Sequence, residues 1–388
     1  MNLNKRHFLR IAGTGAIILA AGSVGYSLTR EPIAARRPWR EAGQYPDAIR
    51  NALSWALLAP NPHNRQPWLV KLHSETEATL HLDTNRLLPH TDPFNRQIII
   101  GLGCFLELLR LAAAQQGLMA HIEHFPDGFP DNSVDDRPIA HINLSGSANP
   151  DPLFASATDR RTNRSGFDTQ RQVDIGLLDQ IQTASLTRTN IAEGLSIGHT
   201  AQQSPLETLR SLAHRAMETE LMTDLTYMES VDLMRIGKSE INANPDGISI
   251  SGIMPEILNH LGPMSYETLS DLNGSAQQDS LDFVKQHAAT AMAWMWFKTS
   301  DNSRIDQIET GAAYLRAHLK ATELGLAWHP MSQALQEFPE MREIYTEIHN
   351  ELAPGGERIQ MLARLGYAKA PAPSPRWPLD TRIIPDRT

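Results

Sequence analysis

Residues 59–68 read APNPHNRQPW, and they come at the end of an apolar run. Pro60, Pro62 and Pro67 stiffen this segment. Asn64 and Gln66 each carry a hydrogen-bond donor and an acceptor, which suits the alternating edge of a flat heterocycle such as a pyrimidine or flavin ring. An ordinary polar turn is the alternative, because asparagine and proline are also common in turns.

The composition is that of a globular protein with one large or two ordinary domains. The chain has 388 residues, of which 41% are hydrophobic and 20% charged. A net charge of −9, with no lysine-rich block, argues against a nucleic-acid partner. The single cysteine, Cys104, cannot form an intrachain disulfide, and its apolar neighbours predict a buried side chain. The fifteen histidines show no metal-ligand spacing, so no metal site is expected.

The N-terminus has the pattern of an export signal. Residues 5–10 read KRHFLR and precede an apolar run at residues 11–28. The charged stretch resembles the twin-arginine motif, with Lys5 in the place of the first arginine. We therefore expect an export signal over residues 1–35, a loose cleavage site at Ala35 and a periplasmic protein. An uncleaved membrane anchor is the alternative. Because the twin-arginine route carries folded and often cofactor-loaded proteins, a cofactor is expected.

The first part of the chain, residues 45–148, mixes helices and strands. Apolar residues at helical spacing end before Pro60, and alternating residues from Trp68 onward predict a hairpin. Residues 98–114 are almost wholly apolar. Glu107 and Arg110 near the middle favour a buried core helix over a membrane span. Residues 119–125 and 138–146 are expected to be short strands.

The second part, residues 152–388, follows a break rich in proline and aspartate. We expect a helix over residues 206–236, an irregular lid over 237–275 and an inner strand over 291–301. Ser303 and Asp306 form a capping-box pattern before a helix that stops near Gly325. Both parts mix helices with a few strands, which predicts the α+β class.

Residues 159–167 read DRRTNRSGF and place Arg160, Arg161, Thr162 and Arg164 within a short segment. Guanidinium groups bind phosphate through two parallel hydrogen bonds and keep their charge, so this motif suits a phosphate monoester. The alternative is a solvated basic turn.

Together, the two motifs resemble the signatures of the nitroreductase superfamily, whose members bind FMN between two subunits. Residues 160–167 look like the arginine signature of one subunit, and residues 59–68 look like the Asn-x-Gln loop of the other. The order of the two motifs is reversed here, which resembles the Acg-like branch. In that branch one chain has two pseudo-repeated halves and mimics the homodimer of the family.

The resemblance implies where FMN would bind. Arg160, Thr162 and Arg164 would hold its phosphate, together with Arg376 near the C-terminus. The expected contacts from the first-half loop and from the turn near residue 330 are Asn61, Pro62, Asn64, Gln66, Pro330, Met331 and Ser332. The acidic residue that usually follows the turn is missing. His63 and His329 flank the site, although a satisfied structural role is the alternative for each.

The resemblance also implies an oxidoreductase that passes hydride or electrons through one flavin to a small, electron-poor acceptor. NAD(P)H is a possible donor, although nicotinamides are scarce outside the cytoplasm. No side chain is required as an acid or base, so catalytic residues are not identified. We expect a monomer that resembles a fused dimer. The alternative function is a protein that sequesters or stores FMN beneath a closed lid.

Overall fold

The computed structural model describes residues 30–187 and 194–385. Residues 1–29 of the expected export signal therefore lie outside the described residues. The described chain begins with short helices, η1 (Ala34–Arg36) and α3 (Pro38–Glu41), that pack against the main body. The described residues also form the 3₁₀ helices η2 (Pro62–Asn64), η3 (Thr84–Arg86), η4 (Pro152–Ser156), η5 (Gln333–Leu335), η6 (Pro339–Met341) and η7 (Leu379–Arg382).

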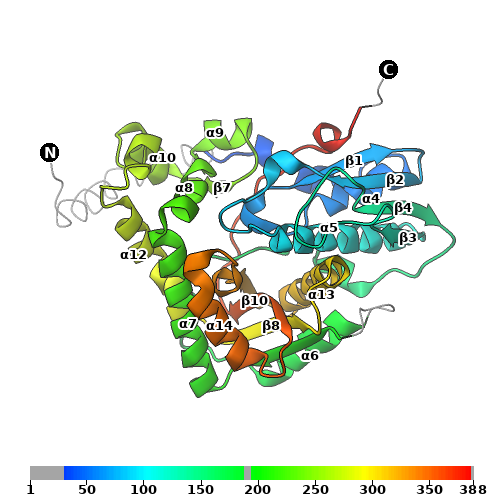
Figure 1. Cartoon of the computed structure of the whole chain (residues 1–388). Coiled ribbons are helices and arrows are strands. Elements are labelled where there is room, and N and C mark those ends of the chain that lie inside the picture. The colour runs from blue at the N-terminus through cyan, green and yellow to red at the C-terminus, as the bar shows by residue number, and fades with distance from the viewer. Residues whose placement is uncertain (1–29, 188–193, 386–388) are drawn as a thin grey trace.

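The first half is built on one antiparallel sheet with the order β1-β2-β4-β3 (Figure 1). Its strands are β1 (Trp68–Leu72), β2 (Glu77–Leu82), β3 (Met119–His124) and β4 (Ala140–Ser145). Helix α4 (Ala48–Ala56) precedes the sheet, and its first turn is capped by the carboxylate of Asp47. Helix α5 (Arg96–Gln115) lies between the hairpin and the second pair of strands in the chain. The predicted hairpin, long helix and two strands are confirmed.

The second half repeats this plan. Helix α6 (Ile175–Leu186) precedes the strands β5 (Ser196–Thr200), β8 (Ala293–Thr299), β9 (Ala327–Pro330) and β10 (Arg358–Gly366). Their order is β5-β8-β10-β9, which is the order of the first sheet when each half is counted from its own start. Helix α13 (Arg304–Glu323) takes the place of α5, and the capping box of Ser303 and Asp306 is present. The α+β class and the two pseudo-repeated halves are therefore confirmed.

The central helices α5 and α13 cross between the two sheets (Figure 1). Each begins with an arginine that contacts the opposite half. Arg96 donates to the carbonyl oxygens of Leu335 and Gln360, whereas Arg304 donates to those of Pro130 and Ser133. Within the described chain, α5 is the one helix long and apolar enough to cross a membrane, and it is mostly buried. It is therefore a core helix, as expected.

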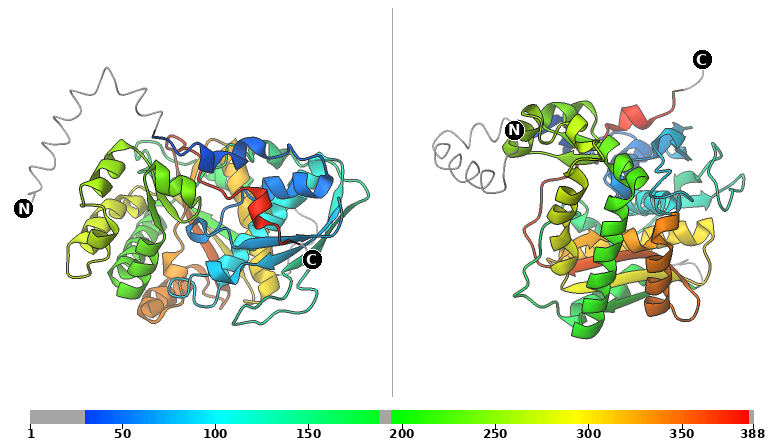
Figure 2. Two further views of the ribbon diagram at one scale, coloured as in Figure 1. Left: turned by 90° about the horizontal axis from the view of Figure 1, so that it is seen from above. Right: turned by 60° about the vertical axis from the view of Figure 1, so that its left-hand side comes forward.

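The region between β5 and β8 differs from the prediction. Instead of one helix over residues 206–236 there are α7 (Gln203–Met222) and α8 (Asp224–Asp232), because the extended backbone of Thr223 separates them. The expected irregular lid contains three short helices, α9 (Lys238–Ala243), α10 (Ile253–His260) and α11 (Tyr266–Leu269). It also contains β7 (Ile248–Ile250), which pairs in parallel with β6 (Met234–Ile236) just before the lid. With α12 (Ala276–Ala289), these elements stand beside the two-sheet body (Figure 2).

The C-terminal segment returns from the second half to the first. Helix α14 (Arg342–Leu352), which the sequence did not predict, precedes β10. Beyond β10, the amide of Trp377 donates to the Gln66 side chain, and the amide of Ile384 donates to the carbonyl of Val70. The tail of the second half thus completes the surroundings of the first-half loop.

Candidate functional site

The loop that carries the first motif has an unusual backbone. His63, Asn64 and Gln66 have φ angles of 45°, 53° and 50°, in the left-handed region that side chains other than glycine seldom adopt. Asn61 holds this shape, because its Oδ1 accepts from the Gln66 amide (2.7 Å) and its Nδ2 donates to the Ala59 carbonyl (3.2 Å). Such strain persists where the surrounding structure enforces it, and it collects at functional sites.

The two side-chain amides of the motif bind protein groups. Gln66 is fully buried; its Nε2 donates to the Pro245 carbonyl (2.8 Å) and its Oε1 accepts from the Trp377 amide (2.9 Å). The Oδ1 of Asn64 accepts from Arg376 (2.6 Å), and its Nδ2 donates to the Pro375 carbonyl (3.1 Å). These amides fasten the loop to the lid and to the C-terminal segment. In this structure they do not present a free edge to a ligand.

Three arginines gather around the indole of Trp39. The guanidinium carbons of Arg160, Arg161 and Arg376 lie 6.0, 4.6 and 5.6 Å from the Trp39 ring centroid. We call these three residues the arginine cluster. The Trp39 indole also donates to the Ser374 carbonyl (2.8 Å), which fixes the ring. The sequence motif predicted the first two arginines and the C-terminal resemblance predicted the third, so the structure brings both predictions together.

Two members of this cluster are buried without a carboxylate. Arg160 and Arg376 are each 2% exposed. Arg160 donates to the Leu58 carbonyl (2.7 Å), and Arg376 donates to the carbonyls of Leu57, Leu58 and Ala59. Burial lowers the pKa of Arg160 to about 10 and that of Arg376 well below its usual range. Among the described residues, the Nε atom of Arg160 has no hydrogen-bond partner. Buried cations without a partner are costly, so the cluster favours an anion.

The rest of the arginine motif leads away from the cluster toward the first-half loop. Thr162 forms a parallel bridge with Trp328, next to the edge of β9. Arg164 is exposed, and within the described chain its guanidinium makes no hydrogen bond or ion pair. The surrounding protein nevertheless lowers its pKa by desolvation.

Arg164 is close to histidines from both halves. Burial, with Arg164 and Arg65 as nearby cations, lowers the pKa of His63 to about 4. Burial also lowers the pKa of His287 to about 4 and that of His329 well below its usual range, with Arg364 and Arg164 adding to both shifts. These imidazoles are therefore neutral at physiological pH. The hydrogen bond from Arg160 to the Leu58 carbonyl likewise joins the arginine motif to the segment that leads into the first-half loop.

Arg364 is a site residue that the sequence analysis missed. It is fully buried on β10, and it donates to His329 Nδ1 (2.9 Å), Thr290 Oγ1 (3.0 Å) and the Ser165 carbonyl (2.7 Å). Its guanidinium also lies 3.8 Å from the Phe167 ring centroid. Burial lowers its pKa to about 9. Arg364 thus supports the arginine motif from behind and adds another buried cation without a carboxylate.

The predicted turn after β9 is close to this site, but two of its side chains point elsewhere. Pro330 pairs with Ala363 of β10. Met331 is 1% exposed and packs in a separate apolar core, and the Ser332 hydroxyl donates to the Leu362 carbonyl (3.2 Å). Pro62 lies beside Gly101 of α5, where it supports the loop. Met331 and Ser332 are therefore occupied by packing in this structure.

The pseudo-repeat places a cavity at the position that corresponds to the arginine cluster. Arg110 and His318 are each the fifteenth residue of their central helix, and His318 contacts the Arg161 carbonyl (3.0 Å). The cavity beside Arg110 has a volume of about 490 Å³. Here the arginines are neutralised. Arg110 pairs with Glu107 (2.7 Å), and Arg316 pairs with Glu107 (3.1 Å) and Asp151 (2.7 Å). The arginine cluster and the cavity beside Arg110, which we call the second equivalent place, therefore differ in charge.

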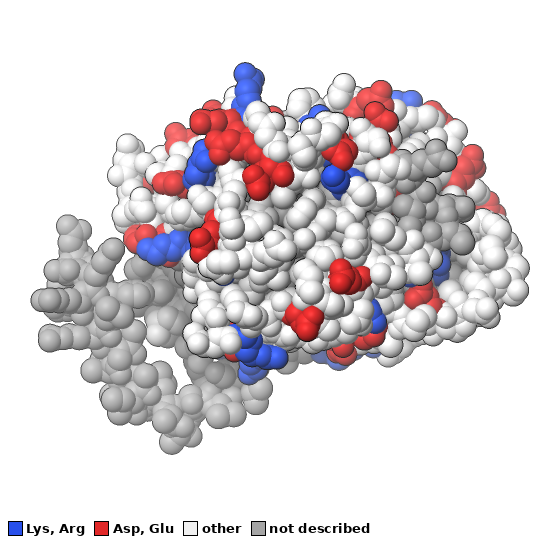
Figure 3. Space-filling view, turned by 90° about the horizontal axis from the view of Figure 1, so that it is seen from below, with Lys and Arg blue, Asp and Glu red and all other residues white. Residues whose placement is uncertain are grey.

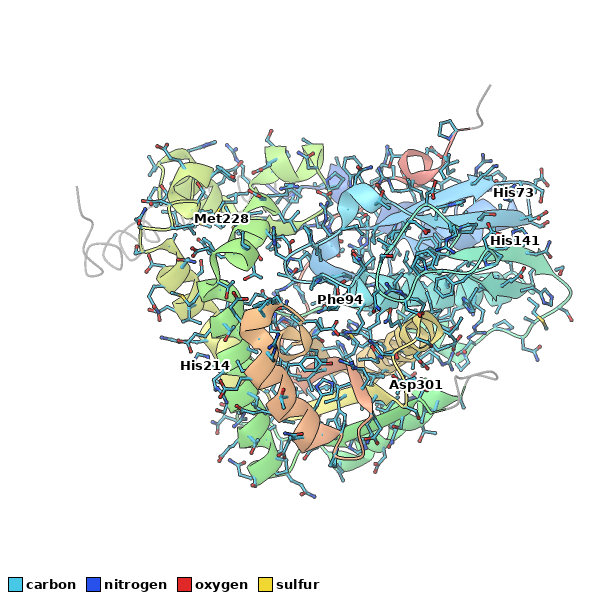
Figure 4. The ribbon with its side chains drawn as sticks, viewed as in Figure 1. His73, Phe94, His141, His214, Met228 and Asp301 are labelled. Atoms are coloured by element: carbon cyan, nitrogen blue, oxygen red, sulfur yellow. The ribbon has the colours of Figure 1, made fainter. Side chains whose placement is uncertain are left out.

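Other reactive side chains lie outside this arrangement. Cys104 is 1% exposed in α5, which confirms the expected buried side chain. His73 and His141 lie together at the outer end of the first sheet (Figure 4), with ring centroids 6.0 Å apart. No group of three or more histidine, cysteine, aspartate or glutamate residues that could hold a metal occurs in the described ranges. On the face seen in Figure 3, basic side chains lie scattered among acidic ones.

No protein-family model matches this sequence. An uncharacterized protein of Mycobacterium tuberculosis, Rv3127, is 33% identical over 167 residues, which are 38% of this chain. The match spans about half (47%) of the length of that relative. Two further relatives from the same organism carry the name "Putative NAD(P)H nitroreductase". The acg protein is 34% identical over 29% of this chain and 35% of its own length, and Rv3131 is 25% identical over 86% of this chain and 90% of its own.

The solved structures are less similar to this chain in sequence than these relatives are. The FMN-dependent nitroreductase NfnB of Mycobacterium smegmatis, in complex with NADPH, is 17% identical with a TM-score of 0.36 and covers 59% of this chain and 95% of its own. An iodotyrosine deiodinase bound to FMN and 3-iodo-L-tyrosine is 14% identical with the same TM-score and covers 61% and 99%. The likeness to the named sequence relatives is higher in identity but shorter for acg, and it extends over most of both chains for Rv3131.

Proposed function

We propose that this chain binds one FMN at the junction of its two halves. The observation that carries the proposal is the set of buried arginines without carboxylate partners, Arg160, Arg364 and Arg376, beside the exposed Arg164. A phosphate monoester carries nearly two negative charges and several acceptor oxygens, so it would neutralise such a set. The residues therefore fit the phosphate end of FMN. When bound, FMN would supply the hydride and electron transfer that side chains cannot perform.

We propose that the chain is a fused form of the family's dimer with a single flavin site. The matching sheet orders and the crossing of α5 and α13 support two former subunits. The second equivalent place is a poor phosphate site, because Glu107 and Asp151 already neutralise Arg110 and Arg316. One flavin per chain follows from this difference in charge.

In the proposed oxidoreductase, the residues of this chain bind and position the cofactor. The arginine cluster and Arg164 would hold negative charge, and Arg364 would keep the arginine motif in place through the Ser165 carbonyl. The neutral imidazoles of His63 and His329 would add no charge near pH 7. A small, electron-poor molecule is the proposed acceptor, with NAD(P)H as the candidate donor.

A second candidate function is FMN sequestration, and the lid contacts favour it. Asp246, at the start of the lid, is 5% exposed and pairs with Arg86 (2.5 Å), Arg65 (3.5 Å) and Arg235 (3.4 Å). The neighbouring Pro245 carbonyl accepts from Gln66. A lid fastened in this way would limit the access of a nicotinamide to the flavin.

We propose an exported protein that keeps its N-terminal segment as a membrane anchor. The expected cleavage site is at Ala35, which is 3% exposed. Its amide donates to Asn242 Oδ1 (3.0 Å), and its carbonyl accepts from the Arg376 amide (2.8 Å). Because Ala35 is built into the fold beside the arginine cluster, cleavage there would remove contacts of the folded protein.

Two experiments test these proposals. The absorption spectrum of the purified protein should show flavin bands, and Arg160→Ala/Arg164→Ala should lose most of the flavin while the exposed Arg137→Ala keeps it. Full flavin occupancy in the double variant would refute the site. Anaerobic mixing with NADPH then separates the two functions. Rapid bleaching supports the oxidoreductase, whereas bleaching by dithionite alone supports sequestration.

A further inference from the structure

The lid carries an exposed apolar surface. Met254, Ile257 and Leu261, from α10 and the residue that follows it, are 48%, 41% and 74% exposed, and Tyr266 of α11 is 59% exposed. We call these four residues the lid surface. Helix α10 has no buried residue at all. The apolar side of a helix in a globular protein normally faces a core, so this side has no partner among the described residues.

The described chain begins against this same helix. The guanidinium of Arg30, the first described residue, lies 3.2 Å from the carboxylate of Glu256 in α10. The apolar run of residues 11–28 ends two positions before Arg30 in the sequence, and Arg30 is bound to the helix that carries part of the lid surface. Lys5, Arg6 and Arg10 precede that run, as they do in segments that insert into membranes.

The start of the described chain is held in place by contacts before η1 and within it. Ala35 donates to Asn242 of α9, which belongs to the same lid as α10. The carbonyl of Ala35 accepts from Arg376, which ties the segment to the main body. Because Arg30 and Ala35 both bind near the lid, an inserted anchor would bring α10 close to the bilayer surface.

We propose that the lid surface rests in the interfacial layer of the lipid bilayer that holds residues 11–28. This inference rests on the proposal that the N-terminal segment is retained. A bilayer fits the residues: Met254, Ile257 and Leu261 offer an apolar side, and Tyr266 adds an aromatic ring whose hydroxyl bonds Asp232 (2.8 Å). Tyrosine is enriched at membrane interfaces because its ring is apolar and its hydroxyl polar. Helices with one apolar side bind there in proportion to the area they bury.

The test uses the full chain reconstituted in vesicles of phosphatidylcholine and phosphatidylglycerol. Ile257→Cys and Leu261→Cys each receive an environment-sensitive fluorophore, which the buried Cys104 does not compete for. Ile175→Cys is the matched control, because Ile175 is 49% exposed at the start of α6, on the other side of the two-sheet body from the lid. We expect a blue shift at 257 and 261, with quenching by lipids brominated in their acyl chains, and neither change at 175.

Three results would overturn the proposal. If the protein floats with the vesicles but the fluorophores at 257 and 261 keep their emission unchanged, the lid surface remains exposed to water. A blue shift without vesicles would mean that the surface is covered by the N-terminal segment or, if it depends on protein concentration, by a second copy. If the protein does not float with the vesicles, its N-terminal segment is not a membrane anchor. The flavin content of the same samples is read separately, so failure of the FMN site is distinguishable.

Discussion

Gly103 of α5 and Gly311 of α13 lie against each other where the two central helices cross. A Cβ added at Gly311 would lie 2.8 Å from the Cα of Gly103 and 2.1 Å from the Ile100 carbonyl oxygen, and one at Gly103 would lie 2.1 Å from the Ile308 carbonyl oxygen. Both glycines are the eighth residue of their helix, and both isoleucines are the fifth. Each helix thus uses the same surface, as the two partners of a twofold interface do.

Gly103→Ala and Gly311→Ala should destabilise the protein to a similar extent. The added methyl group meets a backbone oxygen of the opposite helix, which cannot move away as a flexible side chain can. We expect a loss of about 1–3 kcal/mol in the free energy of unfolding, measured by urea denaturation. Gly176→Ala in α6 is the control, because its nearest neighbour is the Asp174 carboxylate at 3.2 Å. Equal stability of all three variants would contradict the close crossing.

Asp246→Asn should loosen the lid. The substitution leaves Arg65, Arg86 and Arg235 without their shared carboxylate, and removing one partner of a buried ion pair costs about 3–5 kcal/mol. We expect faster hydrogen exchange of the amides at residues 237–250 and faster release of FMN. The exposed Asp271→Asn is the matched control. Unchanged exchange in Asp246→Asn would show that the lid is held by other contacts.

Trp39→Leu should weaken FMN binding although Trp39 lies outside both sequence motifs. The indole holds three guanidinium groups within 6.0 Å of its centroid, and cation–π contacts contribute about 0.5–2 kcal/mol each. A net loss of about 1.4 kcal/mol corresponds to a tenfold rise in Kd, measured by flavin fluorescence. Trp39→Phe should keep most of the affinity. If Leu and Phe bind FMN equally well, the ring has no part in holding the arginines.

Glu220→Gln should make stability less dependent on pH. Burial raises the pKa of Glu220 to about 7 from its ordinary value of 4.5, with Gln336 donating to its carboxylate. The folded state therefore binds more protons than the unfolded state between these pH values, and stability falls as pH rises from about 4.5 to 7. At pH 8 the variant should be more stable than the natural chain by about 1–3 kcal/mol, and at pH 4.5 nearly equal. Urea denaturation at both pH values measures this, and a parallel fall of both proteins would contradict it.

Local sequence signals predicted most of the secondary structure. The capping box of Ser303 and Asp306 located the start of α13, and alternating residues located β1 and β2. The break at Thr223 was missed because the helical pattern continues on both sides of a single extended residue. Boundaries of this kind depend on tertiary packing rather than on propensity.

The candidate site was predictable in part. The arginine motif and the first-half loop were found because each is a contiguous stretch, and in the structure Arg160 of the motif donates to the carbonyl of Leu58, directly before the loop. Trp39 and Arg364 were missed because their partners are far away in the chain. A single arginine within the apolar residues of β10 was the available signal for Arg364. The bonds of Gln66 to Pro245 and Trp377 likewise join distant segments, which a motif cannot reveal.

The number of FMN molecules released per chain tests the central claim most directly. The protein is purified, its concentration is fixed by amino-acid analysis, and the flavin is quantified after denaturation. The account predicts one FMN per chain, lost in Arg160→Ala/Arg164→Ala and kept in Glu107→Gln, which alters only the second equivalent place. Two FMN molecules per natural chain, or one that persists in the double arginine variant, would contradict a single site at the junction of the halves.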